Sequence, residues 1–393
     1  MKYEKYYHHF IENNQYPRQL TDVEVISGAS SLHLSYQGKK VINFSSSDYL
    51  GLSHHPYLIE QAQYYAEHYG VGSSASRLVT GNFAFYTELE KKLAKALGKP
   101  AALIMGSGYQ TNVSVLEAIL DSKVLGHMPL IFCDKFCHAS IFAATRHFKT
   151  MQRFRHNDLN HLRLLLEKHK HTDQQKFIVA ESIYSMEGDA VDLAELIHIA
   201  KEHQAFLYID DAHAVGIYGK QGFGKTAEYA DDIPIVMGTF SKALGSFGSY
   251  IGCSELMKKY LINKCRGLIY STGLSPAVIG AISAAIELLP TLHAERQQVL
   301  RKAEYVKNFF LTENLYTSQM TTHIVPWIIG NAEKTRYASE LLQQQGILGT
   351  AIQPPSVPVG RSRIRFCLSA AHTDADIEHL IRAIRVVKKN PLK

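Results

Sequence analysis

The sequence predicts an α/β protein: a large domain whose mostly parallel sheet is covered by helices, followed by a smaller α+β domain. Apolar runs with strand character alternate with helix-period segments through most of the chain. From about Leu289 a long helical stretch leads to a strand, a helix, two short strands and a final helix. We therefore expect an N-terminal helix and hairpin segment over residues 1–50, a large domain over 51–290 and a small domain over 291–393.

The strands of the large sheet are predicted from six short apolar runs. These runs are Ala101–Met105, Leu130–Cys133, Phe177–Ala180, Phe206–Ile209, Ile233–Met237 and Ser249–Gly252. Helix-period segments lie between most of them, for example Leu159–Lys168 and Leu193–His203. Repeated alternation of strand and helix is typical of a mostly parallel sheet.

The two ends of the chain carry the remaining elements. Residues 3–14 have the pattern of an amphipathic helix, and Leu32–Tyr36 and Val41–Phe44 that of a hairpin turned by Gln37 and Gly38. The small domain is expected to contain helices Ala294–Thr312, Glu333–Gln345 and Ala375–Lys388 and the strand Ile324–Ile329.

Composition and charge narrow the class of protein. The chain has 393 residues and a formal net charge of +6. It has no apolar run long enough to span a bilayer, and its N-terminal residues lack the apolar core of a secretion signal. We therefore expect a cytoplasmic enzyme without a membrane span. The mild basic excess suits an anionic substrate such as a coenzyme A ester or an acidic carrier protein, and sparse aromatic residues near the basic stretches argue against a nucleic-acid partner.

The five cysteines predict neither a disulfide framework nor a metal site. An odd number cannot all pair with one another, which suits a reducing compartment. Cys133 and Cys137 precede His138, but no second cysteine pair stands at a spacing suitable for zinc. We therefore expect no metal.

The most informative segment is the apolar run Phe206–Ile209, which ends in Asp210 and Asp211 and is soon followed by His213. In an open α/β sheet, ligands bind beyond the carboxyl ends of strands. After one more apolar strand, Lys242 stands among small residues. Pyridoxal phosphate (PLP) needs a carboxylate to keep its ring nitrogen protonated and a lysine for its Schiff base. Either motif alone could simply mark the end of a strand. The two together, in this order, indicate a PLP site.

Six ordered segments resemble the α-oxoamine synthase family of fold-type-I PLP enzymes. They are Asn43–Leu52, Gly72–Gly81, Asp210–His213, Gly238–Lys242, Tyr270–Gly273 and Ser369–His372. The resemblance covers residues from about 40 to 385. It implies a fold-type-I transferase that uses PLP to condense an amino acid with an acyl thioester and to release carbon dioxide.

The resemblance also implies roles for the residues around the cofactor. Lys242 forms the Schiff base and Asp210 pairs with the pyridine nitrogen. His213 contacts the phenolic oxygen, His138 stacks on the ring face, and Ser185 lies near the cofactor. All but Ser185 are expected to be catalytic, although His138 and Ser185 taken alone are more often ordinary interior residues.

The cofactor phosphate is expected where a strand turns into a helix. Gly108 and Tyr109 stand at that turn, where free N–H groups and the helix dipole suit an anion. The resemblance implies that Thr239 adds a hydroxyl from the same subunit and that Thr272 reaches the phosphate from the other subunit. The expected assembly is therefore a homodimer with shared active sites.

Substrate contacts are expected from both ends of the chain. Arg363 and Arg365 are two apart on one face of a strand, and Arg365 is chosen for the amino-acid carboxylate, which a guanidinium holds with two bonds. Ser47, Ser356 and Arg18 are the other expected substrate contacts.

Within the family, the segment Ala351–Gly360 most resembles the member that joins L-alanine to a pimeloyl thioester on the way to biotin. The segments Gly106–Asn112 and Arg153–Leu159 point the same way. Ser47 stands where that member usually has asparagine, and Gln353 where arginine is common. Three alternatives stay open: serine with a palmitoyl thioester, glycine with an acetyl thioester, and a non-catalytic scaffold of the same fold. The donor is either a coenzyme A ester or a carrier-protein ester.

One further motif is expected to be a decoy. Gly219–Thr226 matches the phosphate-loop pattern of nucleotide hydrolases. That loop works where a strand feeds straight into it, whereas here the strand ends near Asp210 and loop-like residues intervene. We therefore expect a glycine-rich surface loop.

Overall fold

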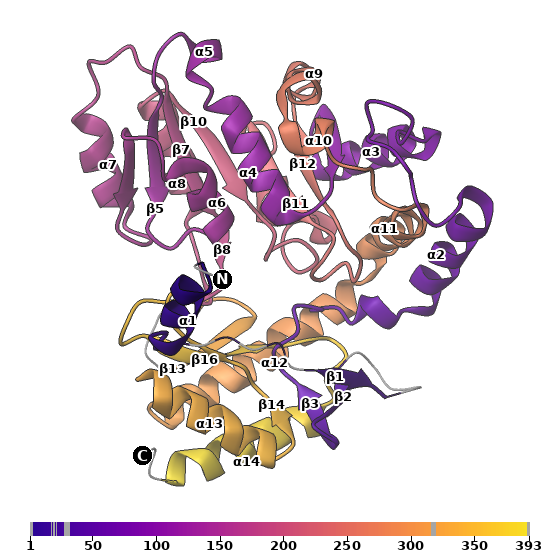
Figure 1. Cartoon of the computed structure of the whole chain (residues 1–393), viewed down its shortest axis with the longest axis vertical. Helices are drawn as coiled ribbons and strands as arrows, with labels where there is room; N and C mark the ends of the chain where they lie inside the picture. The colour runs from indigo at the N-terminus through magenta and orange to yellow at the C-terminus, as the bar shows by residue number, and fades with distance from the viewer. Residues whose placement is uncertain are drawn as a thin grey trace.

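A seven-stranded sheet organises the large domain in the computed structural model, which describes residues 3–16, 18, 20, 22–26, 32–315 and 320–390. The strand order is β4-β12-β11-β10-β7-β5-β6 (Figure 1). In that order the bounds are Ala101–Met105, Ser249–Cys253, Ile235–Thr239, Ala205–Asp210, Lys176–Glu181, Leu130–Asp134 and Met151–Phe154. The pairs from β11 to β6 are parallel, and β12 runs antiparallel to β11 and β4. The predicted, mostly parallel sheet is confirmed.

Each of the six predicted apolar runs lies wholly or largely in a strand of this sheet. Five of the strands are buried at every position, so both faces of the sheet are covered, as continuous apolar runs predict. The sequence did not predict β6, because Met151–Phe154 is a short edge strand in which Phe154 alone is buried.

Five helices lie between strands of this sheet in the chain, and α9 and α10 follow its last strand, β12. In chain order they are α4 (Gly108–Ile119), α5 (Ser122–Leu125), α6 (Ala139–Thr145), α7 (Leu159–Glu167), α8 (Leu193–Glu202), α9 (Glu255–Lys264) and α10 (Arg266–Ile269). The two helices predicted between strands correspond to α7 and α8. Helix α4 begins just after β4, where the side chain of Ser107 accepts a hydrogen bond from the backbone N–H of Gln110 at 3.3 Å.

The small domain is built on a three-stranded antiparallel sheet in the order β13-β16-β15. Its strands are β13 (Ile324–Gly330), β16 (Ser362–Cys367) and β15 (Ala351–Ile352). Three helices accompany it, α12 (His293–Thr312), α13 (Ala332–Gln344) and α14 (Asp374–Lys389). These elements confirm the predicted α+β character of the C-terminal part.

The N-terminal hairpin pairs with the C-terminal part of the chain. The strands β1 (Val23–Val25), β2 (His33–Tyr36), β3 (Lys39–Asn43) and β14 (Ile347–Leu348) form a four-stranded sheet in that order. The predicted turn at Gln37 and Gly38 is present, and both residues have positive φ, as a two-residue hairpin turn requires. Strand β3 runs parallel to β14, so residues just before the Asn43–Leu52 segment are held by the small domain.

Among the described residues, two large apolar clusters form the core, and Leu34, Val41 and Leu348 form a small third one. One covers the inner faces of α4 to α9 and the central strands of the large sheet. The other extends without interruption from α3 (Ala84–Leu97) through α11 (Pro276–Leu288) to Ile324, Phe366 and Leu380 of the small domain. The two domains therefore share one body of packed side chains, and the positions of the domain boundaries stay a prediction.

The connection between the domains bends sharply. Helix α11 and the short helix η4 (Leu289–Thr291) meet α12 at 78°. Within the described part of the chain, no single helix is long and apolar enough to cross a membrane, and only this bent pair passes a test of length and composition. Both helices contribute buried residues to the core.

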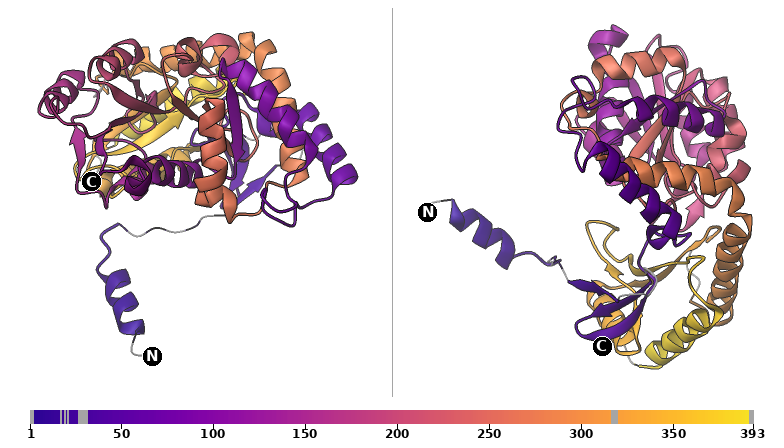
Figure 2. Two further views of the ribbon diagram at one scale, coloured as in Figure 1. Left: turned by 90° about the horizontal axis from the view of Figure 1, so that it is seen from above. Right: turned by 90° about the vertical axis from the view of Figure 1, so that its right-hand side faces the viewer.

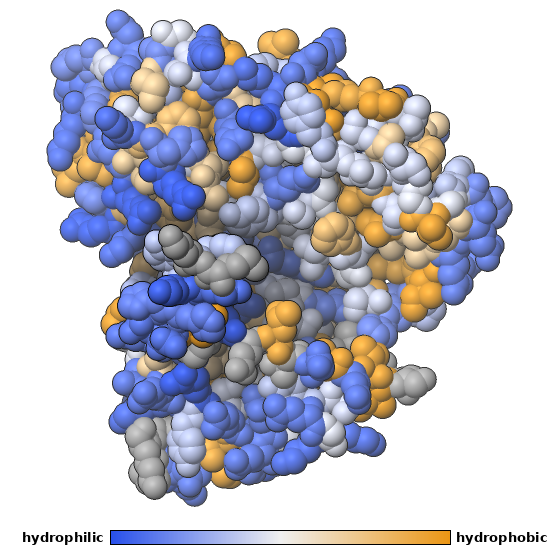
Figure 3. Space-filling model, viewed as in Figure 1, coloured by the Kyte–Doolittle hydropathy of each residue, from blue (hydrophilic) through white to orange (hydrophobic). Residues whose placement is uncertain are grey.

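Figure 2 shows helix α1 (Glu4–Glu12) standing away from the rest of the molecule, and none of its residues is buried. Figure 3 shows the surface hollowed between the large domain and the small domain. The remaining elements are α2 (Pro56–Tyr69), the hairpin strands β8 (Ile183–Tyr184) and β9 (Asp189–Ala190), and the short helices η1 (Leu52–His54), η2 (Lys220–Gly222) and η3 (Lys225–Tyr229).

Candidate active site

Acidic side chains lie at the carboxyl ends of two neighbouring parallel strands. Asp210 ends β10 and Glu181 ends β7, and the two residues are directly paired in the sheet. Both are buried, with exposed fractions of 6% and 4%. Burial and the neighbouring Asp210 raise the pKa of Glu181 well above its usual range. Glu181 therefore holds a proton more readily than an exposed glutamate does, beside the carboxyl group of Asp210.

Asp210 is held by two donors from different elements. Its Oδ2 accepts a hydrogen bond from Nδ2 of Asn112 in α4 at 2.8 Å, and its Oδ1 accepts one from the backbone N–H of Ala212 at 3.0 Å. Asn112 is itself fixed, because its Oδ1 accepts a hydrogen bond from the hydroxyl of Tyr208 at 2.7 Å. The carboxylate thus has little freedom to turn at the strand end.

Lys242 lies in the loop after β11, the strand next to β10. Burial lowers the pKa of Lys242, while Asp210 and Glu181 act in the opposite direction. The loop closes against the N-terminal motif at Gly245, whose φ is +62° and where a Cβ would lie 2.3 Å from the backbone N of Ser53. Only glycine fits there, so a lysine amine that deprotonates readily is presented by a loop of fixed shape.

His213 completes the acid-base groups around the strand ends. Burial lowers the pKa of His213 well below its usual range, and the nearby cations Lys242 and Arg365 add to the shift. Its Nδ1 lies 2.7 Å from the hydroxyl of Tyr49, a fully buried residue of the Asn43–Leu52 segment. The imidazole is therefore neutral and anchored on one side.

His138 approaches the same group of side chains from the start of α6. Its backbone N–H donates to the carboxyl of Glu181, and its Nδ1 lies 2.6 Å from Oγ of Ser140. His138 is exposed at the open side of the site, yet partial desolvation by its neighbours lowers the pKa of its imidazole, and Asp210 opposes this shift. The ring of Tyr109, at the start of α4, meets His138 edge-on with centroids 6.4 Å apart.

A place for an anion lies between β11 and the first turn of α4. The backbone of Gly108 is so close to Thr239 that a Cβ there would lie 2.8 Å from Cγ2 of the threonine. The hydroxyl of Thr239 is buried and has no hydrogen-bond partner among the described residues. An unpaired buried hydroxyl beside the N-terminus of a helix suits a phosphate group.

The expected substrate contacts fall into two groups. Arg365 in β16 is half-buried and acts electrostatically on Lys242, His213 and Tyr49, so the small domain contributes a cation to the site. Ser47, two residues before Tyr49, is half-buried.

Further out, Nη2 of Arg18 donates a hydrogen bond to Oγ of Ser356 at 3.2 Å, so the structure brings these two exposed residues together. Within the described part of the chain, neither side chain forms a hydrogen bond or an ion pair with the strand-end residues.

The other expected residues lie at the border of the site. Ser185 is buried at the turn of the β8–β9 hairpin. Thr272 is exposed, forms an isolated bridge with Ser76, and lines a small surface cavity together with Gly106 and Gln110. Thr272 thus faces outward near the start of α4 of its own chain.

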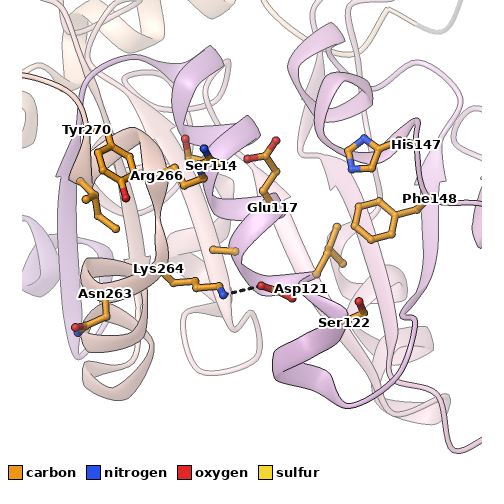
Figure 4. A pocket seen from close by; sticks show the side chains of 13 residues that line it. Ser114, Glu117, Asp121, Ser122, His147, Phe148, Asn263, Lys264, Arg266 and Tyr270 are labelled. Atoms are coloured by element: carbon orange, nitrogen blue, oxygen red, sulfur yellow. Dashed lines mark ion pairs between the residues drawn. The ribbon is translucent and has the colours of Figure 1, made fainter.

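A larger cavity of about 590 Å³ lies at the opposite end of α4 (Figure 4). Its walls include Glu117, His147 and Arg266, and an ion pair of 2.6 Å joins Lys264 and Asp121 across it. Because α4 begins at the candidate site and ends at this cavity, the cavity is remote from the strand-end residues.

The loop that matches the phosphate-loop pattern is closed on itself. Oδ2 of Asp211 accepts hydrogen bonds from the backbone N–H and the hydroxyl of Thr226, at 3.0 and 2.6 Å. A Cβ at Gly224 would lie 2.1 Å from the same oxygen, and one at Gly219 would lie 1.7 Å from the carbonyl of Gly224. A carboxylate therefore occupies the place that a nucleotide phosphate would need.

Sequence reasoning missed four residues of the site. Tyr49 and Asn112 lie inside segments that were singled out, and Glu181 directly follows the predicted strand Phe177–Ala180, but nothing in their spacing says that they meet Asp210 or His213. Ser140, two residues after His138, could have been found as the partner of that ring.

The fold is that of the fold-type-I PLP enzymes. The chain is similar in structure to a serine palmitoyltransferase from S. paucimobilis with a bound PLP–myriocin aldimine, with a TM-score of 0.87 over 94% of this chain and 92% of that chain. The two are 24% identical in sequence, so this likeness establishes the fold alone.

The chain belongs to the family Aminotransferase class I and II, which matches residues 39–384. It is 44% identical to the 8-amino-7-oxononanoate synthase of Gluconacetobacter diazotrophicus, over 88% of each chain. It is also 47% identical, over 88% of each chain, to a protein of Paramagnetospirillum magneticum that is provisionally given the same name. These relatives confirm the resemblance to α-oxoamine synthases.

Proposed function

We propose that this protein is a PLP-dependent acyltransferase that makes 8-amino-7-oxononanoate for biotin biosynthesis. A bond forms between Cα of L-alanine and the carbonyl carbon of a pimeloyl thioester, the thiol leaves, and the alanine carboxylate is lost as carbon dioxide. One observation carries this proposal. Lys242 and Asp210 interact electrostatically at the ends of adjacent strands. They do so in a chain that is 44% identical to an 8-amino-7-oxononanoate synthase.

The residues present fit PLP. The unpaired hydroxyl of Thr239 and the N-terminus of α4 at Gly108 and Tyr109 would hold the phosphate. Asp210 would hold the ring nitrogen, and Lys242 would bind the cofactor covalently. His138 and His213, with Ser185, would line the remaining sides of the ring. When bound, PLP supplies an electron sink for the negative charge that develops at Cα.

Three residues of this chain then bind the substrate, remove a proton and stabilise the developing charge. The guanidinium of Arg365 binds the carboxylate of alanine with two hydrogen bonds. Lys242 takes the proton from Cα, because burial lowers the pKa of its amine toward the range in which it is a base at neutral pH. His213, neutral and anchored by Tyr49, donates a hydrogen bond to the acyl oxygen as negative charge develops there.

Alanine and a pimeloyl thioester are preferred over the substrates of related synthases. The support is the name of the 44% identical relative and the segment Ala351–Gly360. Ser356 of that segment meets Arg18, so we assign this pair to the acyl chain side of the site. Ser47 stands where that family member usually has asparagine, and Gln353 stands where arginine is common. These two departures bear most directly on the choice of substrates.

The working unit is a homodimer in the cytoplasm. Thr272 is exposed and faces outward, which suits a residue that completes the phosphate site of a second copy. All five cysteines are free and buried, as suits a reducing compartment. The acyl donor is a coenzyme A ester or a carrier-protein ester.

The test crosses alanine, glycine and serine with acetyl, pimeloyl and palmitoyl thioesters of coenzyme A, with each product identified by mass spectrometry. We expect 8-amino-7-oxononanoate from alanine and pimeloyl-CoA as the fastest reaction. A faster reaction of serine with palmitoyl-CoA, or of glycine with acetyl-CoA, would assign the chain to that activity instead. If no pair reacts with the coenzyme A esters or with pimeloyl carrier protein, the proposal is wrong.

A further inference from the structure

The β8–β9 hairpin joins the strand ends of the large sheet to the sheet of the small domain. It follows β7 directly, and its two strands pair Ile183 with Ala190 and Tyr184 with Asp189. In Figure 1, β8 lies at the border between the large sheet and the strands β13 and β16. The turn of the hairpin carries Ser185, so its position affects the candidate active site.

On the side of the large domain, His156 clamps the hairpin to the end of β5. Its Nδ1 lies 2.9 Å from Oδ1 of Asp134, and its Nε2 lies 3.0 Å from Oδ2 of Asp189. Asn157 adds two further bonds, from its backbone N–H to Asp134 at 2.9 Å and from Nδ2 to Asp189 at 2.7 Å. With a carboxylate at each nitrogen, the ring is a double donor that bridges two elements.

The faces and edges of this imidazole are packed as well. The ring of Phe136 lies against His156 with centroids 4.8 Å apart, and Tyr184 of β8 meets it edge-on at 4.6 Å. Asp134 is fully buried and fixed by the backbone N–H of Phe136 at 2.7 Å. The clamp is therefore a packed contact rather than an exposed ion pair, which would contribute little.

On the side of the small domain, the hairpin turn is held by a buried arginine. Nη1 of Arg363, a fully buried residue of β16, lies 2.8 Å from Oε1 of Glu187 and donates to the carbonyl of Met186 at 2.6 Å. The carbonyl of Gly188 accepts from the backbone N–H groups of Thr321 and Thr322, both at 3.1 Å. The hairpin is thus fixed at both ends.

This connection leads to the substrate cation. Arg363 stands two residues before Arg365 in β16, so the two side chains stand on one face of the strand about 7 Å apart. Arg365 is the proposed ligand of the amino-acid carboxylate, whereas Asp210 and His213 belong to the large domain. The distance between the two halves of the site is therefore set in part by the hairpin.

We propose that His156 is a positioning residue: by clamping Asp189 to Asp134, it fixes the β8–β9 hairpin and, through Glu187 and Arg363, sets Arg365 against the strand ends of the large sheet. This inference rests on the proposed function, because it assumes an amino acid that spans Arg365 and the strand ends. A displacement of 1 Å in such a site costs about a hundredfold in rate.

The test compares the holoenzyme of the His156→Gln variant with the wild type. Glutamine can bond one carboxylate but cannot bridge both as a cation. The first readout is the concentration of L-alanine that half-saturates the change in cofactor absorption, without any thioester. The second is hydrogen–deuterium exchange, followed by mass spectrometry, of peptides covering residues 183–190 and 361–367. Lys99→Met is the matched control. Lys99 is also buried, and its amine donates hydrogen bonds to the carbonyls of Ala230 and Ile233 at the other edge of the sheet.

We expect His156→Gln to weaken alanine binding tenfold or more, to speed exchange in both peptides, and to leave the cofactor attached to Lys242. Lys99→Met should change neither readout. The inference is overturned if alanine binding is unchanged or weakened only as much as by Lys99→Met, or if exchange rises in residues 183–190 but not in 361–367. If the wild type binds none of alanine, glycine or serine, the proposed function itself has failed. Should His156→Gln not fold, Asp189→Asn breaks the same link from the hairpin side.

Discussion

The hydroxyl of Tyr49 lies 2.7 Å from Nδ1 of His213, and both residues are buried. Burial raises the pKa of Tyr49, so the phenol stays protonated. Burial also lowers the pKa of His213, so the imidazole stays neutral. A tyrosine that donates to Nδ1 leaves the single imidazole proton on Nε2, on the side away from Tyr49. The bond therefore fixes the orientation of the ring, and the tautomer follows from which of the two groups donates.

Replacing this tyrosine should impair the step that His213 serves. In Tyr49→Phe the ring loses its anchor, and we expect kcat to fall by roughly tenfold or more, with a smaller change in the affinity for PLP. The measurement is steady-state kinetics with alanine and pimeloyl-CoA at saturating PLP. Tyr250→Phe is the matched control, because the buried hydroxyl of Tyr250 has no hydrogen-bond partner among the described residues. Equal losses in the two variants would mean that the Tyr49–His213 bond has no special part in the reaction.

The adjacent carboxyl groups of Asp210 and Asp211, at the end of β10, should behave differently. Asp210 accepts a hydrogen bond from Asn112 and is the proposed partner of the PLP ring nitrogen, whereas Asp211 accepts hydrogen bonds from Ser182 and Thr226 and closes a loop. Asp210→Asn removes the charge opposite the ring nitrogen and should slow exchange of the alanine Cα proton with solvent by about a thousandfold. Asp211→Asn should lower stability and leave the exchange rate within a few fold. Proton NMR of alanine in deuterium oxide measures the exchange, and a similar loss in both variants would contradict the assignment.

The proposed sharing of active sites between two subunits makes a prediction for mixed dimers. Lys242→Ala and Thr272→Ala should each be inactive or weak as pure dimers. A heterodimer of the two has one site with an intact Lys242 and a Thr272 supplied by the other chain, so we expect part of the activity to return. If Thr272 serves its own chain, the site that keeps Lys242 carries the Thr272 defect and no activity returns. Tagged chains, mixed and purified by both tags, allow this measurement.

The sequence predicts most of the sheet, because its strands are continuous apolar runs bounded by helices. It also predicts that Asp210 stands at a strand end and that Lys242 follows the next strand, and the structure has both residues there. The edge strand Met151–Phe154 escapes prediction, because it is short and mostly unburied. Strand pairing, which sets Glu181 beside Asp210, is a matter of register between segments far apart in the chain.

The contacts around the site are harder to predict than the elements that carry them. Asn112 reaches Asp210 from a helix 98 residues earlier, and His156 reaches Asp189 from 33 residues away. No local sequence pattern predicts either contact. Each contact depends on the conformation of the loop that follows a strand. The resemblance to a known family supplies roles for residues such as Thr272, but not the partners that hold the others in place.

The His156 clamp should make a contribution to stability that depends on pH. Burial alone would lower the pKa of His156, but the bonds to Asp134 and Asp189 outweigh it and raise the pKa from 6.5 to about 10. Tyr184, the other titratable group that packs on the ring, does not ionise in this range, because burial raises its pKa well above the usual value. A histidine whose pKa is higher in the folded state stabilises fully below the pKa of the unfolded state, and the contribution is lost as the pH rises toward the folded pKa.

The difference in stability between wild type and His156→Gln should therefore be largest near pH 6 and shrink steadily toward pH 10. We expect a few kcal/mol at the acid end of this window, because each unit of pKa shift corresponds to about 1.4 kcal/mol. Urea unfolding of both holoenzymes at a series of pH values measures the difference in their free energies of unfolding. The contributions of groups that titrate in the same way in both proteins cancel in this difference. A difference that stays constant from pH 6 to pH 10 would show that the ring is neutral in the folded protein. The clamp would then consist of ordinary hydrogen bonds, and His156→Gln would lower the stability as much at pH 9.5 as at pH 6.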